Sequence, residues 1–306
     1  MLIAKQMIIF FILMLIGVII RKRGIITKEN QSSLSSLVVN VGCPAMILSS
    51  IDSMTSRLAN EELLKTLLIV LITIIVLLIF ARLLPMLLRY DKKYWGVVQN
   101  MVIITNTVFM GMPFIIGVYG KEAVIYLTFF VVPINLLLFT YGVKIIKIET
   151  EPKARKIKDV LNPGMIACIM TIFLYSFSIT LPNILLEPLK ILGGLTTPLA
   201  MLLIGGALLD LKLKEVFTDK RLLVFILIKM ILFPIIYLLL FQQFITNTLL
   251  LGACFVVVAM PTGNIVAMLS ALYNQDTYSL TIKEISLTTA ISVITLPLVA
   301  FLTKIG

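Results

Sequence analysis

Long and nearly uninterrupted apolar stretches constrain this chain more than any other feature of its sequence. Cutting the chain at its charged and turn-forming residues leaves ten of them, each about as long as a helix that spans the hydrocarbon core of a bilayer. They are continuously apolar and do not alternate, so they predict membrane helices and exclude a closed barrel. Their approximate ranges are 2–20, 33–51, 63–84, 97–118, 122–144, 160–181, 188–209, 221–241, 248–272 and 284–303.

The composition agrees with a lipid environment and excludes several classes of function. Of the 306 residues, 60% are apolar and only 13% are charged, whereas soluble domains are about half apolar and about a quarter charged. A soluble enzyme, a nucleic-acid-binding protein and a disordered protein are therefore excluded. The first apolar stretch is followed, not preceded, by the basic residues Arg21, Lys22 and Arg23. It therefore predicts a first span instead of a cleaved signal peptide.

The distribution of the basic residues predicts an orientation. With ten spans, nineteen of the 26 Lys and Arg residues fall on one face of the membrane and six on the other, and Lys229 lies within a span. Loops that face the cytoplasm are enriched in Lys and Arg, so the nineteen mark the cytoplasmic face. We expect a multi-pass protein of the cell membrane, with both termini outside the cytoplasm and the loop 145–159 inside it.

The chain divides into two halves of similar organisation. The charged segment 147–159 separates residues 1–146 from 160–306, with five spans on each side. Because five is odd, halves of common origin lie in opposite orientations, as in many secondary transporters. NVGCPAMIL in the second span aligns with GLTTPLAML in the seventh, and TNTVFMGMPFI in the fourth aligns with PTGNIVAMLS in the ninth, at nearly equal offsets. The predicted fold is an all-α polytopic membrane protein with ten transmembrane helices in two inverted five-helix repeats.

The fourth and ninth spans contain proline, glycine and polar residues near their centres. Proline and glycine weaken a helix, and unpaired backbone groups at membrane depth are tolerated where they face protein or a water-filled cavity. If both helices break and the breaks meet, two half-helix N-termini present N–H groups to one cavity, which suits a carboxylate. The alternative is a pair of kinks whose polar neighbours satisfy the loosened backbone. The predicted substrate-binding residues are Thr105, Asn106, Thr107, Gly111, Pro113, Pro261, Thr262, Gly263 and Asn264.

These segments resemble a known family. NTVFMGMPFIIGVYG, which begins at Asn106, resembles the fourth-span motif of the auxin efflux carrier family, and MPTGNIVAMLSALYNQD, which begins at Met260, resembles the family's second crossover. The segments GVIIRKRGIITKENQSSLSSLVVNVGCPAMIL and TTAISVITLPLVAFL are also similar to the family, so the resemblance covers essentially the whole chain. The family includes plant PIN carriers and bacterial permeases for carboxylates.

The resemblance implies a fold similar to that of the antiporter NhaA and the bile-acid symporters. In that fold the broken helices 4 and 9 cross within a transport unit, which moves against a scaffold unit like an elevator. It also implies that Asn106 binds the substrate carboxylate and that backbone N–H groups after Pro261 complete the anion site. Plant members have proline where this chain has Thr105, so we expect the first break to depend on Gly111 and Pro113.

Several other residues within or beside the spans have more than one interpretation. They either line the cavity or pack helices together: Asn40, Pro44, Thr197, Pro198, Tyr126 and Asn135. Lys229 either supplies a charge to the cavity or extends its amine to the cytoplasmic surface. Glu61 and Lys65 are four residues apart, so they form either an exposed pair at a helix end or part of a coupling mechanism.

The expected function is secondary transport of a small organic anion, such as malate, malonate or an auxin-like aromatic acid. We expect no cofactor, no metal and no nucleic-acid partner, and a homodimer is one option for assembly. Asp52 and Asp210 lie at span ends and we expect no acidic residue near the middle of any span, which favours uncoupled movement over proton or sodium coupling. A coupled symporter and a carboxylate-sensing transceptor stay open as alternatives. An enzyme is disfavoured because the chain has no histidine and its three cysteines are dispersed.

Overall fold

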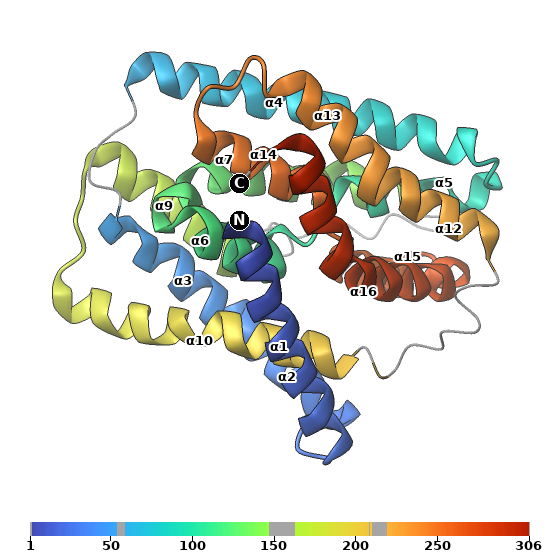
Figure 1. Ribbon diagram of the computed structural model, residues 1–306, viewed down its shortest axis with the longest axis horizontal. Helices are drawn as coiled ribbons and strands as arrows, with labels where there is room; N and C mark the ends of the chain where they lie inside the picture. The colour runs from blue at the N-terminus through green and yellow to red at the C-terminus, as the bar shows by residue number, and fades with distance from the viewer. Residues whose placement is uncertain (1, 54–58, 147–162, 208, 210–218, 306) are drawn as a thin grey trace.

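The computed structural model describes residues 2–53, 59–146, 163–207, 209 and 219–305. Within this part of the chain the regular structure is helical, apart from one isolated β-bridge. The helices pack in two groups (Figure 1). The first helix group consists of α1 (Leu2–Lys22), α2 (Lys28–Leu37), α3 (Cys43–Ser49), α9 (Pro163–Phe177) and α10 (Asn183–Ala207).

The second helix group contains the remaining helices and includes both predicted broken spans. In Figure 1, α4 and α13 run along its upper edge, and α16 lies in front beside α1. Its members are α4 (Asn60–Leu87), α5 (Lys92–Ile103), α6 (Met112–Tyr119), α7 (Val124–Leu137), α8 (Val143–Ile146), α12 (Lys220–Leu227), α13 (Phe233–Phe241), α14 (Thr248–Ala259), α15 (Ile265–Tyr273) and α16 (Tyr278–Thr303).

The lengths of the helical segments agree with a multi-pass membrane protein. Six described segments are long and apolar enough to cross a membrane by length and composition: Glu29–Asp52, Asn60–Leu87, Lys121–Ile146, Asn183–Ala207, Lys220–Phe241 and Gln275–Thr303. Three shorter apolar helices are Thr107–Tyr119, Pro163–Phe177 and Thr248–Ala259. The arrangement of ten spans as two inverted repeats stays a prediction. The predicted linker 147–159 lies outside the described residues.

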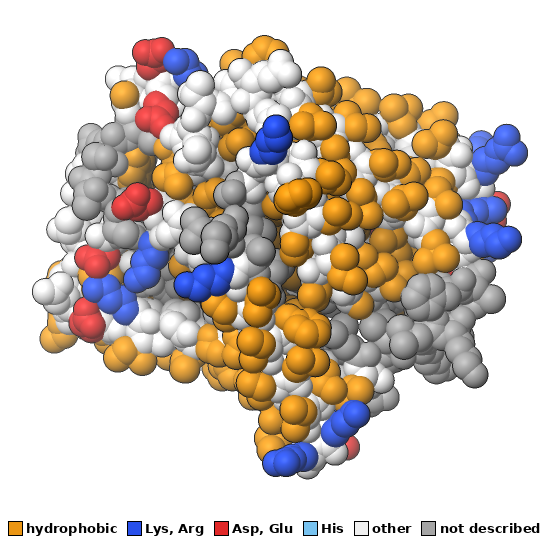
Figure 2. Space-filling model, in the orientation of Figure 1, with side chains coloured by type: hydrophobic (Ala, Val, Ile, Leu, Met, Phe, Trp, Pro, Cys, Tyr) orange, Lys and Arg blue, Asp and Glu red, His pale blue; other side chains and the backbone are white. Residues whose placement is uncertain are grey.

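Much of the surface is apolar. In Figure 2, hydrophobic side chains cover the middle of the visible face, and most charged side chains gather toward its edges. Large apolar side chains on several helices point outward, among them Ile184, which is 82% exposed, and Phe301, which is 80% exposed. Soluble monomers rarely expose apolar patches beyond a few hundred Å². The surface is therefore suited to contact with lipid tails.

Glycines allow α1 and α10 of the first helix group to pack closely. A Cβ placed on Gly17 would lie 2.2 Å from the carbonyl oxygen of Leu202, and one placed on Gly205 would lie 2.0 Å from that of Met14. No side chain fits at either position because the obstructing atoms belong to the backbone. In lipid, where apolar surface gives little drive for association, close packing of this kind holds helices together.

Three prolines follow widened helical turns instead of breaking their helices. Pro44, Pro113 and Pro234 are each the second residue of a helix that comes directly after a π-helical turn. Proline lacks an N–H group and crowds the carbonyl four residues before it, and a wider turn accommodates the ring. The turns are η1 (Val38–Gly42), η3 (Thr107–Gly111) and η8 (Ile228–Leu232).

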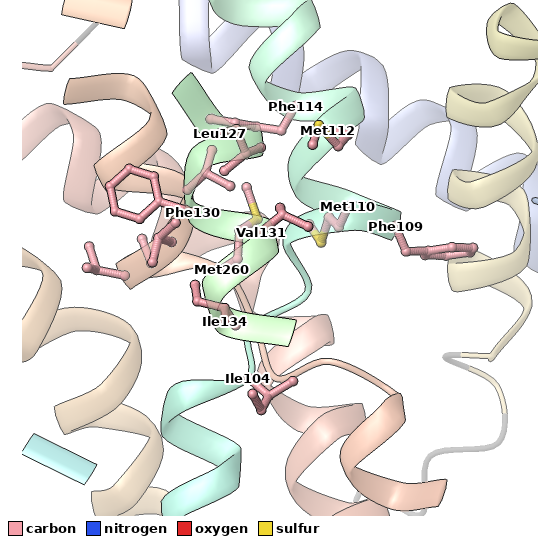
Figure 3. Packing of buried hydrophobic residues seen from close by; sticks show 14 of the residues in the cluster. Ile104, Phe109, Met110, Met112, Phe114, Leu127, Phe130, Val131, Ile134 and Met260 are labelled. Atoms are coloured by element: carbon pink, nitrogen blue, oxygen red, sulfur yellow. The ribbon is translucent and has the colours of Figure 1, made fainter. Parts of the chain in front are cut away.

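The expectation that Gly111 and Pro113 cause the first break is therefore wrong. The helical segment Thr107–Tyr119 runs through both residues, and the break lies before it. Gly111 serves packing instead, since a Cβ there would lie 2.6 Å from Cγ1 of Val256 on α14. The rings of Phe114 and Phe255 stack with centroids 5.6 Å apart, so the second half of this broken helix is packed against α14. Figure 3 shows Phe114 among the buried side chains of this region.

Candidate functional site

Two helices are interrupted at the centre of the second helix group. The first ends with α5 at Ile103 and resumes at Thr107, and the second ends with α14 at Ala259 and resumes with α15 at Ile265. Both interruptions were predicted, and both are confirmed by the helix bounds. The backbone N–H and C=O groups of the two extended segments, 104–106 and 260–264, cannot form helical hydrogen bonds. Each segment therefore needs other hydrogen-bond partners at the same depth in the membrane.

The two extended segments satisfy each other. Thr105 and Thr262 form an antiparallel β-bridge. The N–H group of Asn106 donates to the carbonyl of Pro261 at 2.7 Å, and the N–H group of Gly263 donates to the carbonyl of Ile104 at 2.9 Å. The broken helices therefore cross at their breaks and are joined by a pair of backbone hydrogen bonds.

The two threonine side chains add a second pair of bonds. The hydroxyl of Thr105 donates to the carbonyl of Val257 at 3.0 Å, and that of Thr262 donates to the carbonyl of Met101 at 2.8 Å. Val257 and Met101 lie in the last turns of α14 and α5, where helical carbonyls lack partners. Thr105 in the first break thus caps the end of α14, and Thr262 in the second break caps the end of α5. Thr105 does so although plant members of the family that this chain resembles have proline at this position.

A cavity of about 110 Å³ lies beside the crossing. Of the nine predicted substrate-binding residues, Asn106 and Asn264 line it. Neither carboxamide has a hydrogen-bond partner within the described part of the chain, although Asn106 is only 7% exposed. The described residues that line it are Gln31, Ser35, Asn106, Phe109, Leu203, Ile204, Ala207, Asn264, Ile285, Ser286 and Thr289.

Two helix N-termini open at this cavity. One begins with Thr107 after Asn106, and the other is α15 after Asn264. Among the described residues, the N–H groups of Val108, Phe109, Asn264 and Ile265 have no backbone acceptor. Such groups and the helix dipole favour negative charge. In Figure 3 the side chain of Phe109 points away from the rest of the labelled cluster, toward α10.

Among the described residues, the lining of the cavity is polar in part and carries no charged side chain. Its polar members are two asparagines, one glutamine, two serines and one threonine, all of which can donate hydrogen bonds. The arrangement can therefore bind an anion through uncharged donors and helix dipoles, and any net charge of the bound molecule must be balanced from outside the lining.

The other predicted residues of the crossing belong to its structure. Thr107 is buried, and its N–H group donates to the carbonyl of Thr105 at 2.8 Å. Pro261, Thr262 and Gly263 are also buried, and the bonds described above occupy them. Like Gly111 and Pro113, these residues do not line the cavity. A direct role of theirs in binding substrate stays a prediction.

The second and seventh spans contribute to the cavity, but through residues other than the predicted ones. The amide of exposed Asn40 donates to the hydroxyl of Ser36 at 2.9 Å, and Pro44, Thr197 and Pro198 are half-buried outside the lining. The residues that these two spans supply are Gln31, Ser35, Leu203, Ile204 and Ala207. No proline or glycine stands beside Gln31 or Ser35, and although Gly205 and Gly206 lie between Ile204 and Ala207, only the fold brings these residues to the cavity.

Tyr126 and Asn135 lie away from the cavity. The hydroxyl of Tyr126 donates to Oε1 of Glu62 at 2.9 Å and accepts from the amide of Asn247 at 2.8 Å, which ties α7, α4 and the start of α14 together. The amide of Asn135 donates to the carbonyl of Val131 on its own helix at 2.8 Å. Both residues are thus occupied by neighbouring groups.

Glu61 and Lys65 form an exposed pair at the start of α4. Their charged groups are 2.7 Å apart, and their side chains are 81% and 68% exposed. Pairs of this kind on a helix surface contribute about 0.2–0.5 kcal/mol. A coupling role for the pair stays a prediction, and no residue of the crossing or of the cavity lining contacts it through a hydrogen bond within the described residues.

Lys229 does not reach the surface. It is 2% exposed, and its Nζ lies 3.3 Å from Oε1 of Glu284, which is fully buried. The sequence placed no acidic residue near the middle of any span, and the structure adds a buried acid, Glu284, between the start and the middle of α16. α16 begins at Tyr278, six residues before the predicted start of its span, so Glu284 stands inside the helix and not at its end.

Thr262 connects this ion pair to the crossing. Its hydroxyl lies 2.7 Å from Oε1 of Glu284 and also accepts a hydrogen bond from Nζ of Lys229. The second oxygen of Glu284, Oε2, has no hydrogen-bond partner among the residues that the structure describes. One signal could have revealed Glu284, because buried polar residues recur every three or four positions along the apolar helix α16: Thr281, Glu284, Thr288, Ser292 and Thr295.

Comparison with known proteins gives two matches. A sequence model of the family described as "Membrane transport protein" matches residues 2–300. An uncharacterised transporter of Methanocaldococcus jannaschii is 28% identical over 216 residues, which are 67% of this chain and 69% of the archaeal protein. The family match extends over both broken helices, the cavity lining and the buried ion pair.

Proposed function

Because the chain belongs to the membrane transport protein family, we propose that it carries a small carboxylate, such as malonate or malate, across the cell membrane. The observation that carries this proposal is the buried carboxamide of Asn106. It has no hydrogen-bond partner among the described residues and lines a cavity at which two helix N-termini open. The resemblance to the auxin efflux carriers noted from the sequence supports the same function.

The chemistry of the cavity favours a carboxylate over a cation or a neutral solute. A carboxylate has two oxygens that accept about four hydrogen bonds, and the cavity offers amide, hydroxyl and free backbone donors. A hydrogen bond to a charged group contributes about 1.5–3 kcal/mol, and a helix N-terminus adds about 0.3–1 kcal/mol for a nearby anion. A cation would face these same positive dipole ends, and the described residues of the lining include no carboxylate to offset them.

The volume of the cavity favours small acids. Pockets for drug-sized ligands typically measure about 300–1,000 Å³, and this cavity measures about 110 Å³. Acids with three or four carbons fit such a space better than an auxin-like aromatic acid. Malonate and malate are therefore the preferred candidates among the substrate classes that the sequence suggested.

The position of the cavity supports an elevator mechanism. Its lining comes from α2 and α10 of the first helix group and from η3, α16 and the two breaks of the second. In this proposal the closely packed first group is the scaffold, and the second group carries the crossing and its substrate across the bilayer as one body. The proposal includes the predicted ten helices in two inverted repeats.

The predicted orientation assigns this structure an inward-facing state. Gln31 lies near the start of the second span, and Ser286 lies in the first half of α16. The charge distribution puts the starting ends of both helices on the cytoplasmic side. Substrate would then enter or leave this cavity from the cytoplasm. The opposite state would expose the same crossing to the outer face.

Two measurements test the proposal. In detergent, malonate or malate should raise the apparent thermal stability of the purified protein, because a ligand that binds the folded state stabilises it. In liposomes, the protein should mediate uptake of the same labelled acid. Absence of both effects across a panel of small carboxylates would reject the proposal. Stabilisation without uptake would instead favour a carboxylate-sensing transceptor.

A further inference from the structure

The ion pair Lys229–Glu284 is placed where it can balance the charge of a substrate. Both side chains are almost completely buried, and Thr262 of the crossing contacts both. The residue after Glu284, Ile285, lines the cavity, and so does Asn264, two residues after Thr262. Glu284 and Thr262, which contacts both members of the pair, thus lie on segments that also line the cavity.

The charge state of the pair depends on a proton. With Glu284 ionised and Lys229 protonated the pair is neutral, and a proton on Glu284 leaves it with one positive charge. A net charge buried at membrane depth is strongly disfavoured. Binding a substrate anion alone, in a cavity whose described lining carries no charge, therefore costs free energy. Protonating Glu284 alone also costs free energy. When both occur together, the two charges offset each other.

We propose that Glu284 takes up a proton each time the cavity binds a carboxylate, so that the protein is a proton–carboxylate symporter. This inference rests on the proposed function and names its driving ion. The unpartnered Oε2 of Glu284 is the atom that accepts the proton. The empty crossing then contains a neutral ion pair. The loaded crossing contains, in addition, one proton and one anionic charge, so its net charge is the same. The crossing can therefore move through the bilayer when it is empty or when it holds both the anion and the proton. It cannot move when it holds the anion alone or the proton alone.

Other ionisable groups near Glu284 do not replace the pair. Tyr90, which precedes α5, faces Glu284 and lies under the guanidinium of Arg221, 5.3 Å from its ring centroid. Tyr237 on α13 shares a hydrogen bond with Thr73. The remaining ionisable groups on the elements packed against α16 lie at or near element ends: Lys5, Arg21 and Lys22 on α1, Lys92, Lys93 and Tyr94 on α5, Lys220 and Arg221 on α12, Tyr273 on α15 and Asp276 in η9 (Gln275–Thr277).

The first test uses the unaltered protein in liposomes that contain a pH-sensitive dye. At a pH at which malonate is chiefly its monoanion, uptake of labelled malonate should move about one further proton with each monoanion, so that no net charge crosses, and an inward proton gradient should drive accumulation. Malonate uptake without proton movement would overturn the inference and leave the proposed function intact. Uptake driven by a sodium gradient in place of a proton gradient would overturn it as well.

The second test measures malonate binding in detergent as a function of pH. If binding takes up one proton, the affinity of the unaltered protein should weaken by up to about tenfold for each unit by which the pH rises. Glu284→Gln mimics the protonated carboxyl group permanently, so its affinity should be independent of pH over a range in which malonate stays a monoanion. Glu62→Gln removes a half-buried carboxylate of α4 far from the crossing and should keep the pH dependence of the unaltered protein.

The outcomes separate the two proposals. Binding whose affinity is the same at every pH in the unaltered protein contradicts proton coupling and still supports a carboxylate site. A pH dependence that persists in Glu284→Gln assigns the proton to another group and overturns the role of this residue. No stabilisation by malonate or by any other small carboxylate rejects the proposed function, and the symport inference with it.

Discussion

Thr105 and Thr262 each cap the helix that precedes the other. The hydroxyl of Thr105 donates to a carbonyl in the last turn of α14, which leads into the break that contains Thr262. The hydroxyl of Thr262 donates to a carbonyl in the last turn of α5, which leads into the break that contains Thr105. The two bonds are not equivalent. Thr105 has this one partner, whereas Thr262 also contacts both members of the ion pair Lys229–Glu284. The crossing should therefore depend more on Thr262 than on Thr105.

Substitution by valine, which has the same shape without the hydroxyl, tests this difference. Thr105→Val should destabilise the protein by about 1 kcal/mol, the loss of one buried hydrogen bond. Thr262→Val should cost about 2–3 kcal/mol, since it leaves a helix carbonyl and two buried charged groups with one partner fewer. Thermal unfolding of both variants in detergent measures the effect. Equal shifts would show that the contacts of Thr262 with the ion pair contribute nothing.

The carboxamide of Asn106 should account for a large part of substrate affinity. Asn106→Ala removes a donor that the protein leaves unused, so it should weaken malonate binding by about tenfold to a hundredfold, as expected for a hydrogen bond to a charged group. Stability should change little because no internal bond is lost. Thermal shift as a function of malonate concentration gives the affinity.

Asn135→Ala is the matched control for that substitution. Asn135 is half-buried, and its amide is bonded to its own helix outside the cavity. This variant should bind malonate as the unaltered protein does. If both alanine variants bind equally well, Asn106 is not the ligand of the carboxylate.

Part of this site could be predicted from the sequence, and the reason is local chemistry. Proline, glycine and small polar residues at 261–264 cannot continue a helix in lipid, so the second break follows from the residues themselves. The first break lacks a proline and depends on the partner segment, which bonds to Ile104 and Asn106. A break that two segments stabilise together leaves no clear signal in either segment alone. For this reason the sequence suggested Gly111 and Pro113 as the cause of the first break.

The buried acid was missed for a different physical reason. Lys283 and Glu284 stand side by side, and a pair of charges is normally found where a membrane helix ends. Here the helix begins earlier, at Tyr278, and Glu284 turns inward to Lys229 on η8. Tertiary pairing thus allows a charge where hydropathy alone forbids it, although the polar residues that recur along α16 were a visible signal.

The size of the cavity predicts a size limit for substrates. Malonate and malate should each stabilise the protein in a thermal-shift assay, whereas indole-3-acetate, an auxin-like aromatic acid, should not. The reason is that a volume of about 110 Å³ is small beside the roughly 300–1,000 Å³ of pockets for drug-sized ligands, so a fused ring system fits less well than a three- or four-carbon acid. Competition of each unlabelled acid against labelled malonate uptake in liposomes gives the same ranking independently. Strong competition by the aromatic acid would show that the cavity enlarges during transport.

A cysteine in the cavity tests its predicted access from the cytoplasm. The native cysteines Cys43, Cys168 and Cys254 are buried, so Ser286→Cys introduces a thiol at a half-buried position in the lining. A membrane-impermeant maleimide should label this variant from the cytoplasmic side of inverted vesicles, and malonate should slow the labelling. Labelling only from the outer side would reverse the predicted orientation.

The contact between α1 and α10 should tolerate no added volume at Gly205. In Gly205→Val the new side chain meets the backbone oxygen of Met14, which cannot yield unless the two helices separate. Overpacking of this kind costs about 1–3 kcal/mol, and it should lower both the thermal midpoint and malonate uptake, because the scaffold would no longer support the moving group. Gly194→Val on the same helix is the matched control, since a Cβ at Gly194 meets no atom within 4 Å. Equal tolerance of both substitutions would mean that close packing of α1 and α10 is not required for a stable scaffold.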